Sequence, residues 1–224
     1  MNDHFRYGDT ELSHLKKADK RLGEVIERIG IIRRETVGDL FAAIVHSIVG
    51  QQISTKAQRT IWERIRTSLG EVTPQKVLSI SAEQLQSFGI SFRKTEYIRS
   101  AAQKVASGRL DLGALHFMND GEVCRYLTQI DGIGVWSAEM LMLFSMQRPD
   151  ILSYDDLAIR RGMRMIYHHR ELTRTLFEKY RRRYSPYGSV ASLYIWAVAG
   201  GAIEGMKDPK PNNPTDAKRK QRTR

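Results

Sequence analysis

Two short stretches of the chain combine residue types that can do chemistry. The first is the turn Gly132-Ile133-Gly134, between two runs of helical spacing, and the second is the pair Asp155-Asp156, about twenty residues later. The glycines permit a tight turn, and the backbone N–H groups that open the following helix can bind a phosphate without any side chain. A carboxylate such as Asp156 can stabilise developing positive charge and orient or deprotonate water.

Each of these stretches also has a purely structural explanation. Turns in which two glycines flank one aliphatic residue are common. Gly132 to Gly134 would therefore also suit an ordinary corner between two helices, with Ile133 buried in the core. An aspartate directly before a helix is often an N-cap. Asp156 can be both a cap and a reactive group.

Composition limits the classes of protein to which the chain can belong. Its 224 residues and 41% apolar content suit one large domain or two small ones. Cys124 is the single cysteine, which excludes an intramolecular disulfide, a thiolate zinc site and a four-cysteine iron-sulfur cluster. No apolar run approaches a membrane span of about 20 residues, and the first residues lack the apolar core of a signal peptide, so we expect a cytoplasmic protein without a membrane partner.

The charge of the chain favours an anionic partner. Its formal net charge is +11, and the segment from Lys207 onward accounts for only part of this surplus. A basic body is typical of proteins that bind nucleic acid, because each neutralised phosphate releases counterions.

Apolar residues recur at helical spacing through most of the chain, as in Leu40, Ile44, Val45 and Ile48. This pattern predicts an all-α protein with about ten helices. After Met206 the composition offers almost nothing to bury, so residues 207–224 are expected to form a basic, disordered tail.

Two motifs together resemble a known family. A helix-hairpin-helix over residues 119–146 is followed by a loop that ends in Asp156 before an aliphatic-Arg helix, and the stretches Ile48 to Ser54, Gly89 to Lys94 and Leu193 to Trp196 also match. The chain resembles the helix-hairpin-helix (HhH-GPD) DNA glycosylase superfamily and, within it, the DNA-3-methyladenine glycosylase II family. The resemblance implies two helical lobes with a DNA-binding cleft between them. Their expected extents are 40–150 for the lobe with the hairpin, and 1–39 plus 151–206 for the other.

The resemblance also implies an activity. It places the catalytic carboxylate at Asp156, near C1′ of a nucleotide flipped out of damaged double-stranded DNA. Bifunctional members carry a lysine two residues after the second glycine, where this chain has Trp136, so we expect hydrolysis by water and an abasic product with an intact strand. An alkylated base of the 3-methyladenine type is the expected substrate. Uracil, mismatched thymine or an oxidised purine remains an alternative, as does a non-catalytic DNA-binding protein.

The same resemblance assigns further site residues. An indole face suits a flat and cationic base, and the predicted base pocket consists of Trp136, Trp196, Tyr194, Phe41 and His46. We expect Trp62 in the core, and a core position is the structural alternative for the two pocket tryptophans and for His46. Gln52, with Gln51 beside it, is the predicted wedge that fills the gap left by the flipped base, against the alternative of a solvated loop.

Phosphate binding is predicted at Gly132, Ile133 and Gly134, with Lys94 and Arg160 as further candidates. The histidines show no metal spacing, so we expect no cofactor and no catalytic metal. The resemblance allows a structural monovalent cation at the carbonyl groups of Gln129, Ile130 and Ile133. We expect a monomer, associated with the nucleoid.

Overall fold

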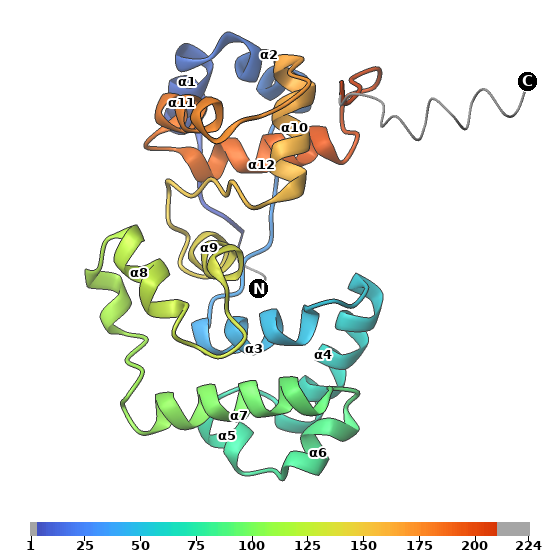
Figure 1. Ribbon diagram of the computed structural model, residues 1–224, viewed down its shortest axis with the longest axis vertical. Coiled ribbons are helices and arrows are strands. Elements are labelled where there is room, and N and C mark those ends of the chain that lie inside the picture. Colours follow the sequence, from blue (N-terminus) through green and yellow to red (C-terminus); the bar gives the residue numbers. More distant parts are fainter. Residues whose placement is uncertain (1–3, 210–224) are drawn as a thin grey trace, which may run out of the picture. The chain divides into compact units, whose positions relative to one another are not determined.

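The computed structural model describes residues 4–209, and within this range it consists of helices and connecting loops (Figure 1). The single β contact recorded there is an isolated bridge between His4 and Glu35. The predicted all-α class is confirmed. No helix in the described range is long and apolar enough to cross a membrane.

The described residues form twelve α-helices and one 3-10 helix, more than the ten or so predicted. The difference arises from short helices such as α5 (Pro74–Leu78) and α6 (Ala82–Ser87), which are too short to show a helical period in the sequence. Each begins at a hydroxyl N-cap, because Thr73 accepts from the Lys76 N–H and Ser81 accepts from the Gln84 N–H.

The first of two compact units comprises residues 4–5 and 35–148. In it α3 packs against α4, α7 and α9, and α8 packs against α9. Ile44 and Ile48 of α3, Ile65 of α4 and Ile98 of α7 are fully buried in its core. Besides α5 and α6, its elements are α3 (Leu40–Gly50), α4 (Thr55–Leu69), α7 (Phe92–Ala106), the 3-10 helix η1 (Ala114–Phe117), α8 (Asp120–Leu127) and α9 (Val135–Phe144).

The second unit is discontinuous and comprises residues 6–34 and 149–209. Its closest packing is between α10 and α12, where a Cβ added to Gly162 would lie 2.2 Å from the carbonyl oxygen of Ile195. Glycine is therefore required for this approach. The elements of the unit are α1 (Asp9–Ala18), α2 (Lys20–Ile29), α10 (Leu157–Tyr167), α11 (Arg174–Tyr184) and α12 (Gly188–Ala199).

The start of the predicted tail contacts α10. Asp208 forms two hydrogen bonds with the guanidinium of Arg164, at 2.9 and 2.5 Å, and this ion pair ties residue 208 to α10. The composition of the segment did not indicate this partly buried partner, and the disorder of the tail stays a prediction. Residues 210–224 of the predicted tail lie outside the described residues.

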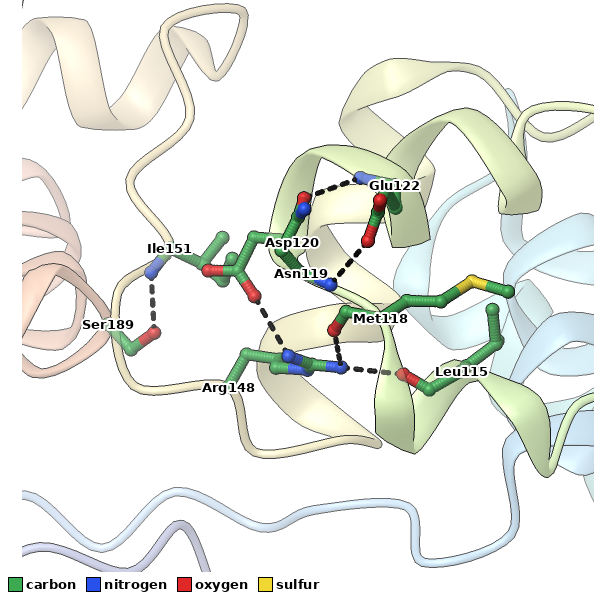
Figure 2. A network of polar contacts seen from close by, with 8 residues as sticks. All are labelled: Leu115, Met118, Asn119, Asp120, Glu122, Arg148, Ile151 and Ser189. Atoms are coloured by element: carbon green, nitrogen blue, oxygen red, sulfur yellow. Dashed lines mark hydrogen bonds and ion pairs between the residues drawn. The ribbon is translucent and has the colours of Figure 1, made fainter.

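The chain passes from the first unit into the second between Arg148 and Pro149. On each side of this point, hydrogen bonds hold the chain to other residues of the same unit (Figure 2). In the first unit, the Arg148 guanidinium donates to the carbonyl groups of Leu115 (2.7 Å) and Met118 (2.9 Å) and pairs with Asp120 (3.3 Å). In the second, the Ile151 N–H donates to Ser189 Oγ at 2.9 Å. The loop that carries Asp156 therefore starts from a fixed point in its unit.

Candidate active site and nucleic-acid interface

Asp156 lies at the N-terminus of α10 and is 7% exposed. Its Oδ1 atom accepts hydrogen bonds from the N–H groups of Ala158 and Ile159, both at 2.8 Å. Asp156 is thus the N-cap of α10, and the same two bonds fix the direction of its carboxylate. A negative charge held at a helix N-terminus can act on a developing positive charge without first reorganising.

The backbone that leads to Asp156 is held by α12 and by the turn before it. The Ser192 hydroxyl donates to the Ile151 carbonyl at 2.9 Å. The Asp150 carboxylate accepts from the Gly188 N–H at 3.0 Å and from the Ser185 hydroxyl at 2.6 Å. Ile151, Leu152 and Ser153 are buried. The loop is therefore part of the rigid core of the second unit until it reaches Asp155, which is exposed.

The turn between α8 and α9 shows two different uses of glycine. Gly132 has a φ of +85°, and a Cβ added there would lie 2.5 Å from the ring of Tyr97. Gly134 has a φ of −89°, and nothing lies within 4 Å of an added Cβ. Both glycines had access to positive φ, but only Gly132 uses it. Ile133 is 4% exposed, so it is the buried plug expected between the helices.

The N-terminus of α9 faces outward. Gly134 gives it no side-chain cap, and Gly134, Val135 and Trp136 are all exposed. The first N–H groups of a helix have no partner within that helix, so this end suits an anion from outside. The space at Gly134 would let a bulky backbone approach closely.

The monovalent-cation site stays a prediction, and two of its carbonyls already have donors. The Ile130 carbonyl accepts from the Ile133 N–H at 2.9 Å, and the Lys104 ammonium lies 3.5 Å from the Gln129 carbonyl. A cation would meet the repulsion of this ammonium. Within the described residues, no group of three or more histidine, cysteine or acidic side chains could hold a metal ion.

Gln51 and Gln52 have different environments, although they are adjacent. The Gln51 side chain donates to the Gly132 carbonyl at 2.6 Å, so it is used inside the protein. Gln52 is exposed and has a φ of +55°, which is uncommon for a residue other than glycine. Gln52 is thus the more accessible of the two predicted wedge residues, and the wedge itself stays a prediction. Sequence reasoning missed the exposed neighbour Ile53, although an apolar residue among polar ones was a usable signal.

Lys94, a predicted phosphate-binding residue, has hydrogen-bond partners inside the protein. Its ammonium donates to the carbonyl groups of Val49 (2.8 Å) and Gln51 (2.7 Å), which end α3, and burial lowers its pKa. These bonds satisfy carbonyls that a helix C-terminus leaves without partners. Phosphate binding by Lys94 stays a prediction, and its two internal partners, 45 and 43 residues away, were not visible in the sequence.

Arg160 also has an internal contact. Its guanidinium lies 4.9 Å from the ring centroid of Tyr154, and Arg174 lies 4.7 Å from the same centroid. Its Nε atom is buried without a hydrogen-bond partner. Arg160 thus packs beside the loop that carries Asp156, and its contact with phosphate stays a prediction.

The predicted pocket residues of the first unit divide by exposure. Trp136 is 46% exposed on the first turn of α9, whereas Phe41 is buried in the core. His46 packs edge-on against Trp62 with ring centroids 4.9 Å apart, and burial lowers its pKa. Trp62 itself is half-buried beside His46, so its expected core position was only partly correct.

In the second unit, Trp196 is half-buried near the end of α12. Tyr194 is fully buried, and its hydroxyl donates to the Gly30 carbonyl at 2.9 Å. Tyr194 therefore holds α12 against the end of α2, and its place in the pocket stays a prediction. The sequence did not indicate this backbone partner, which lies 164 residues away in the same unit.

Comparison with known proteins places these features in a family. A family model described as the HhH-GPD superfamily of base excision DNA repair proteins matches residues 45–186. The crystal structure of a DNA-3-methyladenine glycosidase from Bacillus halodurans is 36% identical, with a TM-score of 0.81, and the match covers 91% of this chain and 95% of that one.

Two comparisons involve the fission yeast Schizosaccharomyces pombe. Its DNA-3-methyladenine glycosylase 1 is 28% identical over 196 residues, which cover 85% of this chain and 86% of that protein. The structure of its 3-methyladenine DNA glycosylase in complex with abasic DNA has a TM-score of 0.73 at 27% identity and covers 84% of this chain and 96% of that one. Since the family model matches more than half of the chain, the chain belongs to the HhH-GPD superfamily of base excision DNA repair proteins, as its motifs predicted.

Proposed function

We propose that the chain is a monofunctional DNA glycosylase of base excision repair that hydrolyses the N-glycosidic bond of flipped alkylated bases of the 3-methyladenine type. The observation that carries this proposal is the Asp156 carboxylate, nearly buried and fixed by two backbone N–H groups at the start of α10. Relatives named for 3-methyladenine, which match this chain over most of its length, support the substrate class.

The chemistry of Asp156 follows from its fixed charge. Departure of the base leaves an oxocarbenium-like sugar, and a preorganised carboxylate lowers the energy of that cation. Water then adds to C1′, with Asp156 orienting it or taking its proton. An alkylated purine already carries positive charge, so it leaves with little protonation from the enzyme. The products are a free base and an abasic site in an intact strand.

Trp136 supports hydrolysis over covalent catalysis. It stands two residues after Gly134, where bifunctional members of the family carry the lysine that forms a Schiff base with the sugar. An indole cannot do this. Its exposed ring can instead stack on a flat, cationic base, and the partly exposed indole of Trp196 is proposed for the same role.

Double-stranded DNA is the proposed partner, bound through the hairpin. The uncapped N-terminus of α9 and the open space at Gly134 suit a phosphate group. Gln52, exposed beside Ile53, is proposed to fill the gap that the flipped base leaves. We also propose that the enzyme acts as a monomer and that its substrate associates it with the nucleoid.

Base release from a defined duplex tests this function. Wild type, Asp156→Asn and Asp155→Asn are incubated under single-turnover conditions with duplexes that carry N3-methyladenine, uracil, mismatched thymine or 8-oxoguanine. We expect wild type and Asp155→Asn to release the alkylated base and Asp156→Asn to be at least about 100-fold slower. Tight binding by all three proteins without base release would contradict the enzyme, and preference for another lesion would contradict the substrate.

The state of the strand tests the monofunctional assignment separately. We expect an abasic product that breaks only after added base or heat, and no protein trapped on DNA by borohydride. Strand scission by the enzyme alone, or a trapped covalent complex, would show an amine nucleophile and overturn this part of the proposal.

A further inference from the structure

One face of α7 contacts both elements to which we assign DNA contacts. Lys94, Tyr97, Ser100 and Lys104 follow one another at intervals of three or four residues, so they lie along one face of the helix. We call this set the α7 stripe. It reaches the wedge loop, residues 51–53, at one end and the hairpin turn, residues 130–134, along the rest of its length.

The contacts along the stripe are specific. At one end Lys94 donates to the carbonyls of Val49 and Gln51. The Tyr97 ring then packs so closely against Gly132 that no Cβ fits there. Lys104 and Ser100 both donate to the Asp131 carboxylate, at 2.9 and 2.8 Å, and these bonds hold the pKa of Asp131 below its usual range.

The wedge loop has a conformation that needs such support. Gln52 is in the left-handed region, which costs free energy for any residue with a Cβ and persists only where neighbouring structure enforces it. The residue before it is held twice, since the Gln51 carbonyl accepts from Lys94 and the Gln51 side chain donates to Gly132. On the other side, the loop ends at Ser54, which caps α4 by accepting from the Ala57 N–H at 3.2 Å, while Gln52 and Ile53 between these two anchors are exposed.

We propose that Lys94 is a positioning residue for base flipping. With Gln51, it holds the wedge loop in register with the hairpin turn, so that the hairpin grips phosphate and Gln52 enters the duplex at a fixed spacing. The inference rests on the proposed function and adds to it a residue that need not touch DNA. Unstacking a base costs free energy, which the contacts of the inserted wedge must offset. A loop that could relax would offset less of this cost.

The experiment separates binding of the duplex from flipping of the base. Lys94→Met keeps the aliphatic stem and removes the ammonium, and Lys76→Met removes the same charge from an exposed position on α5. Three quantities are measured at matched ionic strength: affinity for undamaged duplex, the fluorescence rise of 2-aminopurine placed beside the lesion, and the single-turnover rate of base release.

For Lys94→Met we expect affinity for undamaged duplex within about twofold of wild type, a reduced fluorescence rise, and base release slower by about tenfold or more. Lys94→Arg, which can still donate to two carbonyls, should recover most of the rate. Lys76→Met should match wild type in all three quantities. Gln51→Met should repeat the pattern of Lys94→Met, so the proposal remains testable if Lys94→Met folds poorly.

Two results would overturn the inference. One is wild-type fluorescence and wild-type base release in both Lys94→Met and Gln51→Met. The other is weaker binding of Lys94→Met to undamaged duplex with a salt dependence lower by about one phosphate, which would make Lys94 a phosphate ligand. If wild type opens the duplex but releases no alkylated base, the proposed function fails, and the fluorescence of the variants still decides the role of Lys94.

Discussion

The loop that carries Asp156 and the wedge loop at Gln52 are both held rigidly, but by different means. Asp156 is nearly buried, and its carboxylate bonds to N–H groups two and three residues further on. Gln52 is exposed, and the bonds that restrain its neighbour Gln51 come from Lys94 and Gly132, 43 and 81 residues away.

This difference reflects what each loop is proposed to do. A carboxylate that stabilises charge must be precise and shielded, and a helix N-terminus provides both locally. A wedge must project from the surface, where it cannot be held by its own burial. Its precision has to come from other residues, and we infer that the bonds at Gln51 support the left-handed conformation of Gln52, which costs free energy by itself.

The largest effect is expected at Asp156, where two variants separate its role as a helix cap from its role in catalysis. Asparagine caps a helix about as well as aspartate, so Asp156→Asn should keep the free energy of unfolding within about 0.5 kcal/mol of wild type while base release falls about 100- to 1000-fold. Asp156→Ala loses both, with a cost of about 1–2 kcal/mol in stability. Urea denaturation and single-turnover kinetics measure the two effects.

The outcome that would break the comparison is equal loss of stability in both variants of Asp156. The carboxylate charge itself would then hold the loop, and the slow rate of Asp156→Asn would no longer report on chemistry alone.

The two hairpin glycines offer the next effect, with one serving as the control for the other. Gly132→Ala meets both a positive φ and the Tyr97 ring, so it should cost about 3 kcal/mol of unfolding free energy. Gly134→Ala has space and a negative φ, so its cost should stay below about 1 kcal/mol.

Binding isotherms complete this test. Since an added methyl at Gly134 points into the space proposed for a phosphate, Gly134→Ala should weaken binding to undamaged duplexes of every sequence alike. Unchanged affinity would exclude close approach of DNA at this turn.

The same contrast explains which features the sequence could reveal. The helices, the hairpin turn and the cap at Asp156 depend on residues within a few positions of one another, so periodicity and turn chemistry were sufficient to find them. The internal hydrogen bonds of Lys94 and Tyr194 go to carbonyl groups 43 and 164 residues away, and the sequence predicted neither bond. Asp208 was missed for the same reason, since its partner Arg164 lies in another segment. A single sequence records residue types but not these distant pairings.

A smaller effect is expected at the support of the Asp156 loop. Ser189 is fully buried and accepts from the Ile151 N–H, so Ser189→Ala leaves a buried donor without a partner and should lower the free energy of unfolding by about 1–3 kcal/mol. The exposed Ser185 is the matched control, and Ser185→Ala should cost less than about 1 kcal/mol. An equal loss of unfolding free energy in both variants would mean that Asp150, and not α12, supports the loop.

The smallest expected effect has the opposite sign and lies in the wedge loop. Glycine adopts positive φ without the steric cost that glutamine pays, so Gln52→Gly should raise the free energy of unfolding by up to about 1 kcal/mol, less the entropy that glycine gains when unfolded. The same change removes the wedge, so base release from a paired lesion should slow, while release from a lesion in single-stranded DNA should not. Denaturation and kinetics on the two substrates decide this together. A variant that is less stable than wild type would mean that the Gln52 side chain has native contacts that outweigh its backbone strain, and the wedge loop would then resemble the Asp156 loop more than we infer.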